Sequence, residues 1–386
     1  MSIFRSAAGG TRPLTYCTNV HAAANLDAFE HVLREIVAPL LGRRLGRDAP
    51  LLLGAWWPRD IVDELAVRSE RREQHARVLD ELGLIPASLN VFPAGRFHGP
   101  GVKESVYEPD WSTTERLEYT LRAAEICAEF LTRSRADRAV LSSVPLGFRG
   151  HSREHGPTSE HVHNVFRAAL ALEELRERTG VEVILALEPE PWCMLESVVE
   201  AITWFDDVAL PFAAGQGNEA AMRKHVGVCL DLCHAAVVGE DPIACLRDLE
   251  RAGIRVGKVQ LSSALVARGV HGHEALATGY RDAVYLHQTF EATGRIGPFV
   301  DLDVESFRAA NPVDTDVFRC HYHMPLHWRG DAKVETTQDM VIAFLQAIVA
   351  EPDLLEESVP LEVETYTNPR IEDELEFVVD RLQGTT

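Results

Sequence analysis

Three apolar segments in the second half of the chain each end in acidic residues. They finish at Glu188 and Glu190, at Asp231, and at Glu362 and Glu364. Apolar runs of this length between turn-forming residues are typical of strands covered on both faces, as in a parallel sheet. Because the carboxyl ends of parallel strands meet at one edge, the acids are expected to converge at the mouth of a barrel of alternating strands and helices.

The whole chain alternates strand-like runs with helix-like stretches, which is the signature of an α/β fold with a parallel sheet. The sequence contains nine strand candidates, one more than a closed eight-stranded barrel can hold. The surplus strand is expected to be either 255–261 or 317–324. The candidates are 14–21, 51–57, 87–92, 139–144, 181–187, 226–230, 255–261, 317–324 and 359–365. No repeat or linker divides the sequence. We therefore predict a (β/α)8 TIM barrel with extra loops and insertions, occupying residues 1–386 as a single domain.

Composition narrows the classes of partner. A formal net charge of −21 disfavours nucleic acid and anionic membrane surfaces, while it promotes solubility and favours cations, including a metal. No run approaches the roughly eighteen apolar residues of a membrane span. The seven cysteines lack CxxC or zinc-finger spacing, and the N-terminus lacks an export signal. These features predict a cytoplasmic protein with reduced thiols and no membrane insertion, and they leave a homo-oligomer open.

Period-two alternation along each strand decides which side chains can face the barrel interior. By this rule Glu188 can point inward at the end of the fifth strand. Asp231 lies at the end of the sixth strand and Glu364 at the end of the last. His321 and His323 share one face of segment 317–324. Carboxylate oxygens with an imidazole nitrogen or amide oxygen suit a divalent metal ion such as Mn, Mg, Co or Zn. Taken singly, each acid also fits an ordinary cap or ion pair, and each histidine fits a satisfied core residue.

Two other segments carry candidate ligand-binding groups. The glycine-rich stretch 93–111 contains Arg96 and Lys103, which suit an anionic group such as a phosphate or carboxylate. A structural lid with its charges in water explains this stretch equally well. At the end of the first strand, Asn19 and His21 share a face and could touch the hydroxyls of a ligand.

The order of a strand-end Glu, an Asp-x-x-His and a second strand-end Glu resembles the xylose isomerase-like barrel superfamily, which includes sugar epimerases, hydroxypyruvate isomerases and endonuclease IV-type enzymes. Segments 187–189, 230–234 and 363–366 look like its fifth-, sixth- and eighth-strand motifs. The resemblance implies that Glu188, Asp231 and Glu364 bind a divalent metal. It further implies that Glu188 and Glu364 shuttle a proton at a sugar carbon, and that His234 contacts the substrate.

One position departs from that superfamily. Its seventh strand typically ends in a metal-binding histidine, whereas segment 257–263 of this chain carries Gln260. Glutamine can bind a metal weakly through its carbonyl oxygen, so either the site is modified or His321 or His323 has taken that place. The predicted metal ligands are Glu188, Asp231, Gln260, His323 and Glu364. The predicted substrate-binding residues are His21, Arg96, Lys103, Glu190 and His321.

Several longer phrases resemble the bacterial EboE family of metabolite traffic proteins over nearly the whole chain. They lie at 16–21, 95–99, 187–191, 258–264, 285–289 and 361–367. This resemblance implies the same barrel and a role in a secondary-metabolite gene cluster, and it leaves the reaction open.

We expect a metal-dependent isomerase or epimerase acting on a sugar, cyclitol or similar polyol. One carboxylate would remove a proton next to a carbonyl polarised by the metal, and another would return it. Gln260 motivates a second hypothesis, a non-catalytic binding or carrier protein on the same barrel. A metal-dependent phosphodiesterase is a weaker alternative, because the acidic balance argues against DNA.

Overall fold

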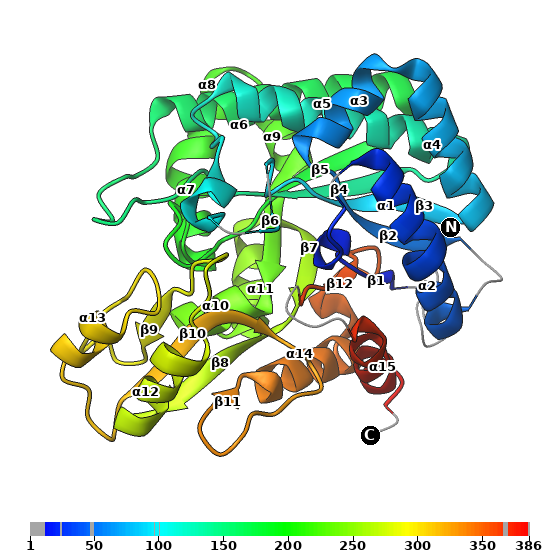
Figure 1. Ribbon diagram of the computed structural model, residues 1–386. Coiled ribbons are helices and arrows are strands. Elements are labelled where there is room, and N and C mark those ends of the chain that lie inside the picture. The colour runs from blue at the N-terminus through cyan, green and yellow to red at the C-terminus, as the bar shows by residue number, and fades with distance from the viewer. Residues whose placement is uncertain are drawn as a thin grey trace.

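Eight parallel strands form the central sheet of the protein, in the order β1-β12-β7-β6-β5-β4-β3-β2. The computed structural model describes residues 12–23, 25–46, 50–95, 97–99, 101–365 and 370–384. A parallel bridge between Cys17 and Gly54 joins β1 to β2, so that the sheet nearly closes into a barrel (Figure 1). The strands are β1 (Leu14–Tyr16), β2 (Leu51–Trp56), β3 (Leu84–Asn90), β4 (Arg138–Ser143), β5 (Glu182–Leu187), β6 (Val226–Asp231), β7 (Arg255–Leu261) and β12 (Leu361–Val363). The predicted (β/α)8 barrel is confirmed.

Amphipathic helices follow the strands, and their apolar faces share one core with the outer face of the barrel. They are α1 (Leu26–Val32), α2 (Ala38–Leu45), α3 (Arg59–Val67), α4 (Ser69–Leu82), α5 (Thr114–Ser134), α6 (Ser159–Thr179), α7 (Val198–Trp204), α8 (Leu210–Gly215), α9 (Glu219–His225), α10 (Leu232–Val238), α11 (Pro242–Ala252), α14 (Gln338–Ala350) and α15 (Ile371–Leu382). Short 3-10 or π segments are η1 (Thr18–Val20), η2 (Leu33–Val37), η3 (Lys103–Tyr107), η4 (Phe205–Ala209) and η5 (Pro352–Leu354).

Local chemistry sets the ends of these helices. Thr158 forms a capping box with His161 at the start of α6, and Gly180 ends that helix with a φ of 76°, in the left-handed region that favours glycine. Asp231 caps α10, where its side chain accepts a hydrogen bond from the backbone N–H of His234. Within the described ranges, no helix is both long and apolar enough to cross a membrane.

An insertion between β7 and β12 forms a second, antiparallel sheet with the order β11-β8-β10-β9. Its elements are β8 (Ser263–Arg268), α12 (Gly269–Gly279), β9 (Thr289–Glu291), α13 (Val304–Ala309), β10 (Val317–Met324) and β11 (Glu335–Thr336). Figure 1 shows it in yellow and orange beside α10 and α14. Of the two candidates for the surplus strand, 255–261 is therefore the barrel strand β7, and 317–324 is β10, outside the ring. The insertion has its own apolar core, which includes Leu265, Phe307 and Phe318.

Candidate functional site

Three carboxylates meet at the carboxyl end of the barrel. Glu188 follows β5, Asp231 ends β6, and Glu364 follows β12. One oxygen from each lies within 4.8 Å of the others, and all three side chains are buried. Glu188 Oε2, Asp231 Oδ2 and Glu364 Oε2 have no hydrogen-bond partner among the described residues. Because an unsatisfied buried oxygen is destabilising, three such atoms in one place suit a divalent cation.

The second oxygen of two of these carboxylates is held by the protein. Glu364 Oε1 accepts hydrogen bonds from Asn19 Nδ2 at 2.9 Å and Asn90 Nδ2 at 3.0 Å. Asp231 Oδ1 accepts one from the backbone N–H of His234 at 2.9 Å. These contacts fix each carboxylate while leaving its other oxygen for the centre, which is the arrangement that orients metal ligands.

Three glutamates at the site have a raised pKa. Burial and the neighbouring charges of Glu364 and Asp231 raise the pKa of Glu188 well above its usual range. Burial also raises the pKa of Glu364, against the opposing charge of Lys258. Burial raises the pKa of Glu190 to about 8, although a hydrogen bond from Tyr107 opposes the shift. A cation that binds here must therefore displace protons, so binding is expected to strengthen as pH rises.

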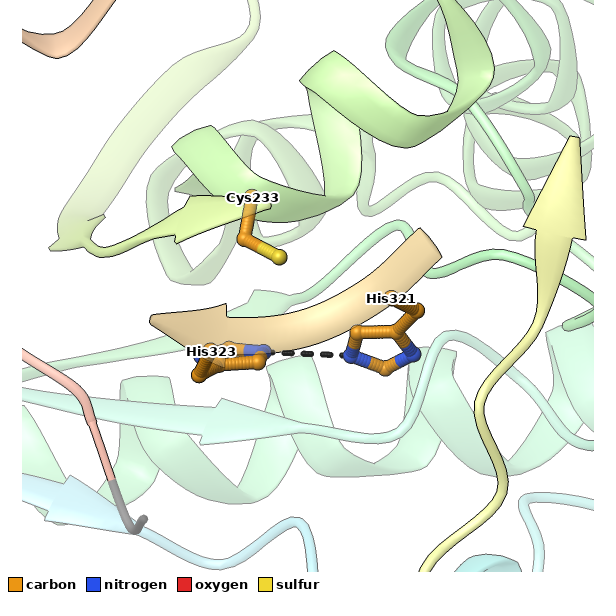
Figure 2. A group of neighbouring side chains, drawn as sticks. All are labelled: Cys233, His321 and His323. Atoms are coloured by element: carbon orange, nitrogen blue, oxygen red, sulfur yellow. Dashed lines mark hydrogen bonds between the residues drawn. The ribbon is translucent and has the colours of Figure 1, made fainter. Parts of the chain in front are cut away.

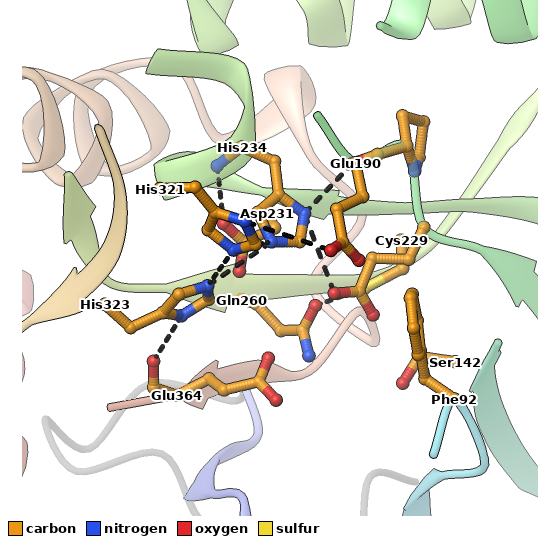
Figure 3. Close-up of polar contacts among 12 residues, drawn as sticks. Phe92, Ser142, Glu190, Cys229, Asp231, His234, Gln260, His321, His323 and Glu364 are labelled. Carbon is orange, nitrogen blue, oxygen red and sulfur yellow. Dashed lines mark hydrogen bonds and ion pairs between the residues drawn. The ribbon is translucent and has the colours of Figure 1, made fainter. Parts of the chain in front are cut away.

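Three histidines stand beside the carboxylates, one on α10 and two on β10. The Nε2 atom of His321 lies 3.1 Å from that of His234 and 3.1 Å from that of His323. The Nε2 atoms of His323 and His234 are 3.3 Å apart. Figure 3 shows the three rings facing one another above Gln260 and Glu364. The insertion thus brings β10 to the mouth of the barrel.

The profile described as "Xylose isomerase-like TIM barrel" matches residues 53–317. The chain belongs to this family. No curated protein sequence matches it.

The chain is also similar to solved structures, at low sequence identity. A xylose isomerase domain protein from Planctomyces limnophilus has 13% identity and a TM-score of 0.48, covering 97% of this chain and 96% of that one. The IolI protein with a binding zinc atom has 14% identity and a TM-score of 0.45, with the same coverages of 97% and 96%. A D-psicose 3-epimerase in the presence of D-fructose has 11% identity and a TM-score of 0.43, again over 97% and 96%.

Gln260 occupies the position on β7 where the xylose isomerase-like resemblance implies a histidine. It is fully buried and pairs in register with Asp231 on one side and Glu362 on the other. Its Oε1 accepts a hydrogen bond from the Cys229 thiol at 3.0 Å. Its Nε2 has no partner within the described part of the chain. The amide oxygen of Gln260, its only metal-binding atom, is therefore directed at Cys229. The amide would have to rotate by a half-turn to bring that oxygen to the position of Nε2.

A small cavity of about 60 Å³ is lined by most of the predicted site residues. Its lining includes Glu188, Glu190, His234, His321, His323, Glu364 and Lys103. Glu190 accepts a hydrogen bond from Tyr107 at 2.8 Å. His21 lies apart from this lining as far as the structure describes it, and its Nε2 is 2.9 Å from the Tyr16 hydroxyl. Burial and His98 lower the pKa of His21 to about 4.

Lys103 binds the insertion. Its ammonium donates hydrogen bonds to the carboxylate of Asp301 at 2.7 Å and to the carbonyl oxygens of Tyr285 and Asp282 at 2.7 and 3.1 Å. The backbone N–H of Lys103 also bonds the carbonyl of Val284 at 2.7 Å. These contacts fasten the glycine-rich stretch to the insertion. Arg96, the other predicted anion-binding residue, lies outside the described residues.

One ion pair of the site was not predicted from the sequence, which indicated Glu362 only as a strand-end acid. Lys258 and Glu362 form a fully buried ion pair of 2.7 Å beneath the carboxylates. A lysine inside an otherwise apolar strand was the available signal, because burying an unpaired charge is unfavourable. Tyr107 and Gln288, which contact Glu190 and His321, carry no comparable local signal.

Proposed function

We propose that this protein is a metal-dependent isomerase or epimerase acting on a sugar, cyclitol or similar polyol. The observation that carries the proposal is the set of three buried carboxylates, each with one unpartnered oxygen among the described residues, at the mouth of a xylose isomerase-like barrel. Glu188, Asp231 and Glu364 would hold the divalent ion. When bound, it would supply positive charge to adjacent substrate oxygens and polarise a carbonyl.

The chain's own residues would move the proton. Glu364 is held in one orientation by Asn19 and Asn90. Burial raises the pKa of Glu188 and of Glu364 in the metal-free site. A bound cation would lower both pKa values, so that each group could accept a proton as a carboxylate and return it. We assign this pair to the two sides of the exchange, and we assign Glu190 to substrate binding.

The cavity is too small for a sugar in this state. About 60 Å³ accommodates only a few water molecules. We propose that the segment around Lys103 and the insertion form a closed cover, which must open at the Lys103–Asp301 contact to admit substrate. Lys103 would therefore keep the cover closed, in addition to or in place of binding an anion.

Metal analysis tests the metal-binding part of the proposal. Purified protein incubated with Mn²⁺ and dialysed should retain an ion at the carboxylates. Glu188→Gln or Asp231→Asn should lose it, because a neutral amide replaces a charged carboxylate ligand. Glu174→Gln, on an exposed position of α6, is the matched control. A wild-type protein that retains no ion would contradict the proposal.

Solvent deuterium exchange tests the reaction. With a panel of ketoses and inosose-type cyclitols in D₂O, wild-type protein should incorporate deuterium at the carbon next to the carbonyl. Glu364→Gln should abolish the incorporation while circular dichroism shows an intact fold. Full exchange in Glu364→Gln would remove that residue from the mechanism.

One observation favours a second candidate, a carrier that binds a small metabolite without turnover. Gln260 directs its amide oxygen at Cys229, away from a ligand role. A carrier would bind a polyol yet show no deuterium incorporation at saturating ligand. From the segments that resemble the EboE family, we further propose that residues 1–386 form one EboE-like domain that acts in a secondary-metabolite pathway.

A further inference from the structure

The three histidines beside the carboxylates have the spacing of metal ligands. Their Nε2 atoms are separated by 3.1, 3.1 and 3.3 Å. In a tetrahedral zinc site with Zn–N bonds of about 2.0–2.1 Å, two ligand nitrogens lie about 3.3 Å apart. His234, His321 and His323 therefore already approach the spacing of three corners of such a site.

The hydrogen bonds of two rings fix where their protons lie. His234 Nδ1 is 3.0 Å from the carbonyl oxygen of Pro189, and His323 Nδ1 is 2.8 Å from the carbonyl oxygen of Glu364. A carbonyl oxygen can only accept, so each Nδ1 carries the proton and donates it. In the neutral rings, the Nε2 atoms of His234 and His323 therefore present lone pairs.

Hydrogen bonds through Gln288 give His321 the same tautomer, because the amide oxygen Gln288 Oε1 can only accept. The Tyr107 hydroxyl donates to Glu190 at 2.8 Å and accepts from Gln288 Nε2 at 2.9 Å. This orientation of the amide turns Gln288 Oε1 toward His321 Nδ1, at 2.7 Å. His321 Nδ1 must then donate, which leaves the lone pair on its Nε2. Such outer contacts orient ligating histidines in metal sites.

Three lone pairs consequently face one another in a buried space. The residues His234, His321 and His323 are only 3%, 6% and 2% exposed. Neutral rings in these tautomers have no proton to share between their Nε2 atoms, and one added proton could bridge only part of the triangle. A metal ion placed against all three lone pairs removes the repulsion.

Cys233 is not needed as a ligand. Its sulfur lies within 4.8 Å of a ring nitrogen of His321 and of His323. However, the backbone of Tyr322 hydrogen-bonds this sulfur, and Figure 2 shows Cys233 across the β10 ribbon from the two rings. Two carboxylates are alternatives to the thiol. An oxygen of Asp231 lies within 4.8 Å of ring nitrogens of His234 and His323, and an oxygen of Glu190 lies within 4.8 Å of ring nitrogens of His234 and His321.

We propose that His234, His321 and His323 form a second metal site, adjacent to the carboxylate centre and built from three imidazole nitrogens. Nitrogen ligands in this geometry select Zn²⁺ or Co²⁺, whereas the all-oxygen centre suits Mn²⁺ or Mg²⁺. Asp231 or Glu190 would lie near the fourth position. The insertion supplies two of the three ligands, so this site joins β10 to the barrel. The inference does not depend on the reaction proposed above.

Metal stoichiometry and spectroscopy test this site without an activity assay. Chelator-treated wild-type protein, titrated with Co²⁺ and then dialysed, should retain two ions per chain and show the visible absorption of a four-coordinate Co²⁺ site with nitrogen ligands. His321→Asn and His323→Asn should each lose one ion and that absorption. Glu188→Gln should lose the other ion and keep the absorption. His163→Asn, at an exposed position of α6, is the matched control.

Anomalous diffraction from Zn²⁺-soaked wild-type crystals provides a test that needs no variant. A peak among the three Nε2 atoms supports the site. A wild-type protein with an ion only at the carboxylates, or histidine variants that keep two ions and an unchanged spectrum, would overturn it. Either of those results leaves the carboxylate centre and its proposed reaction standing, so the two proposals fail separately.

Discussion

Replacing Lys258 by methionine should destabilise the protein, because it leaves a buried carboxylate without its cation. Lys258 Nζ donates to Glu362 Oε1 at 2.7 Å and to Ser142 Oγ at 2.9 Å. The other oxygen of Glu362 accepts from Ser88 Oγ at 2.6 Å. Although burial opposes its charge, Glu362 holds the pKa of Lys258 above its usual range.

The magnitude follows from complete burial. Both side chains of the pair are 0% exposed, and removing one partner of a buried ion pair destabilises a protein by about 3–5 kcal/mol. For 386 residues, an unfolding entropy of about 2.1 cal/mol/K per residue converts this loss into a fall of roughly 4–6 °C in Tm. Removing both charges, in Lys258→Met/Glu362→Gln, should recover most of the loss, since a neutral pair avoids the unpaired charge.

Urea denaturation followed by circular dichroism, with a chelator present to remove metal effects, measures these differences. Lys333→Met, at an exposed position, is the control and should change stability by no more than about 0.5 kcal/mol. The reasoning fails if Lys258→Met is as stable as wild type. It also fails if the double variant is as unstable as the single one, because the unpaired charge would then not be the cause.

Three further predictions concern the barrel, the site and its cover. Gly54→Ala should lower Tm, because a Cβ there would lie 2.3 Å from the Tyr16 carbonyl oxygen, whereas Gly95→Ala meets nothing within 4 Å and should leave Tm unchanged; equal effects in differential scanning fluorimetry would contradict this. The pKa of Glu190 is raised to about 8 in the metal-free folded state, so between about pH 4.5 and 8 the folded protein keeps a proton that the unfolded chain loses. The metal-free protein should therefore become less stable as pH rises through this range. The Tm increase caused by Zn²⁺ should therefore be larger at pH 8 than at pH 6, and an equal increase at both would refute the coupling. Lys103→Met should speed chymotrypsin cleavage of the cover by removing its bonds to the insertion, and an unchanged cleavage rate would show that the contact does not hold the cover.

Period-two and helical patterns made the barrel predictable from the sequence, because they report burial along a single element. The acids at 188, 231 and 364 could be assigned to strand ends for the same reason, since a strand's end and its inward face are local properties. The shared face of His321 and His323 followed from their spacing of two residues. The buried position of Lys258 could also have been predicted, because it lies within an apolar strand.

Which distant strand or side chain each of these residues meets was decided only by the tertiary structure. Segments 255–261 and 317–324 are both buried strands, and pairing alone makes one β7 and the other β10. His234 lies 87 residues from His321, and they meet because the insertion packs its sheet against the mouth of the barrel. Lys103 reaches Asp301 across 198 residues, which no local pattern records. Side-chain periodicity describes which face of an element is covered, whereas a site depends on which distant element covers it.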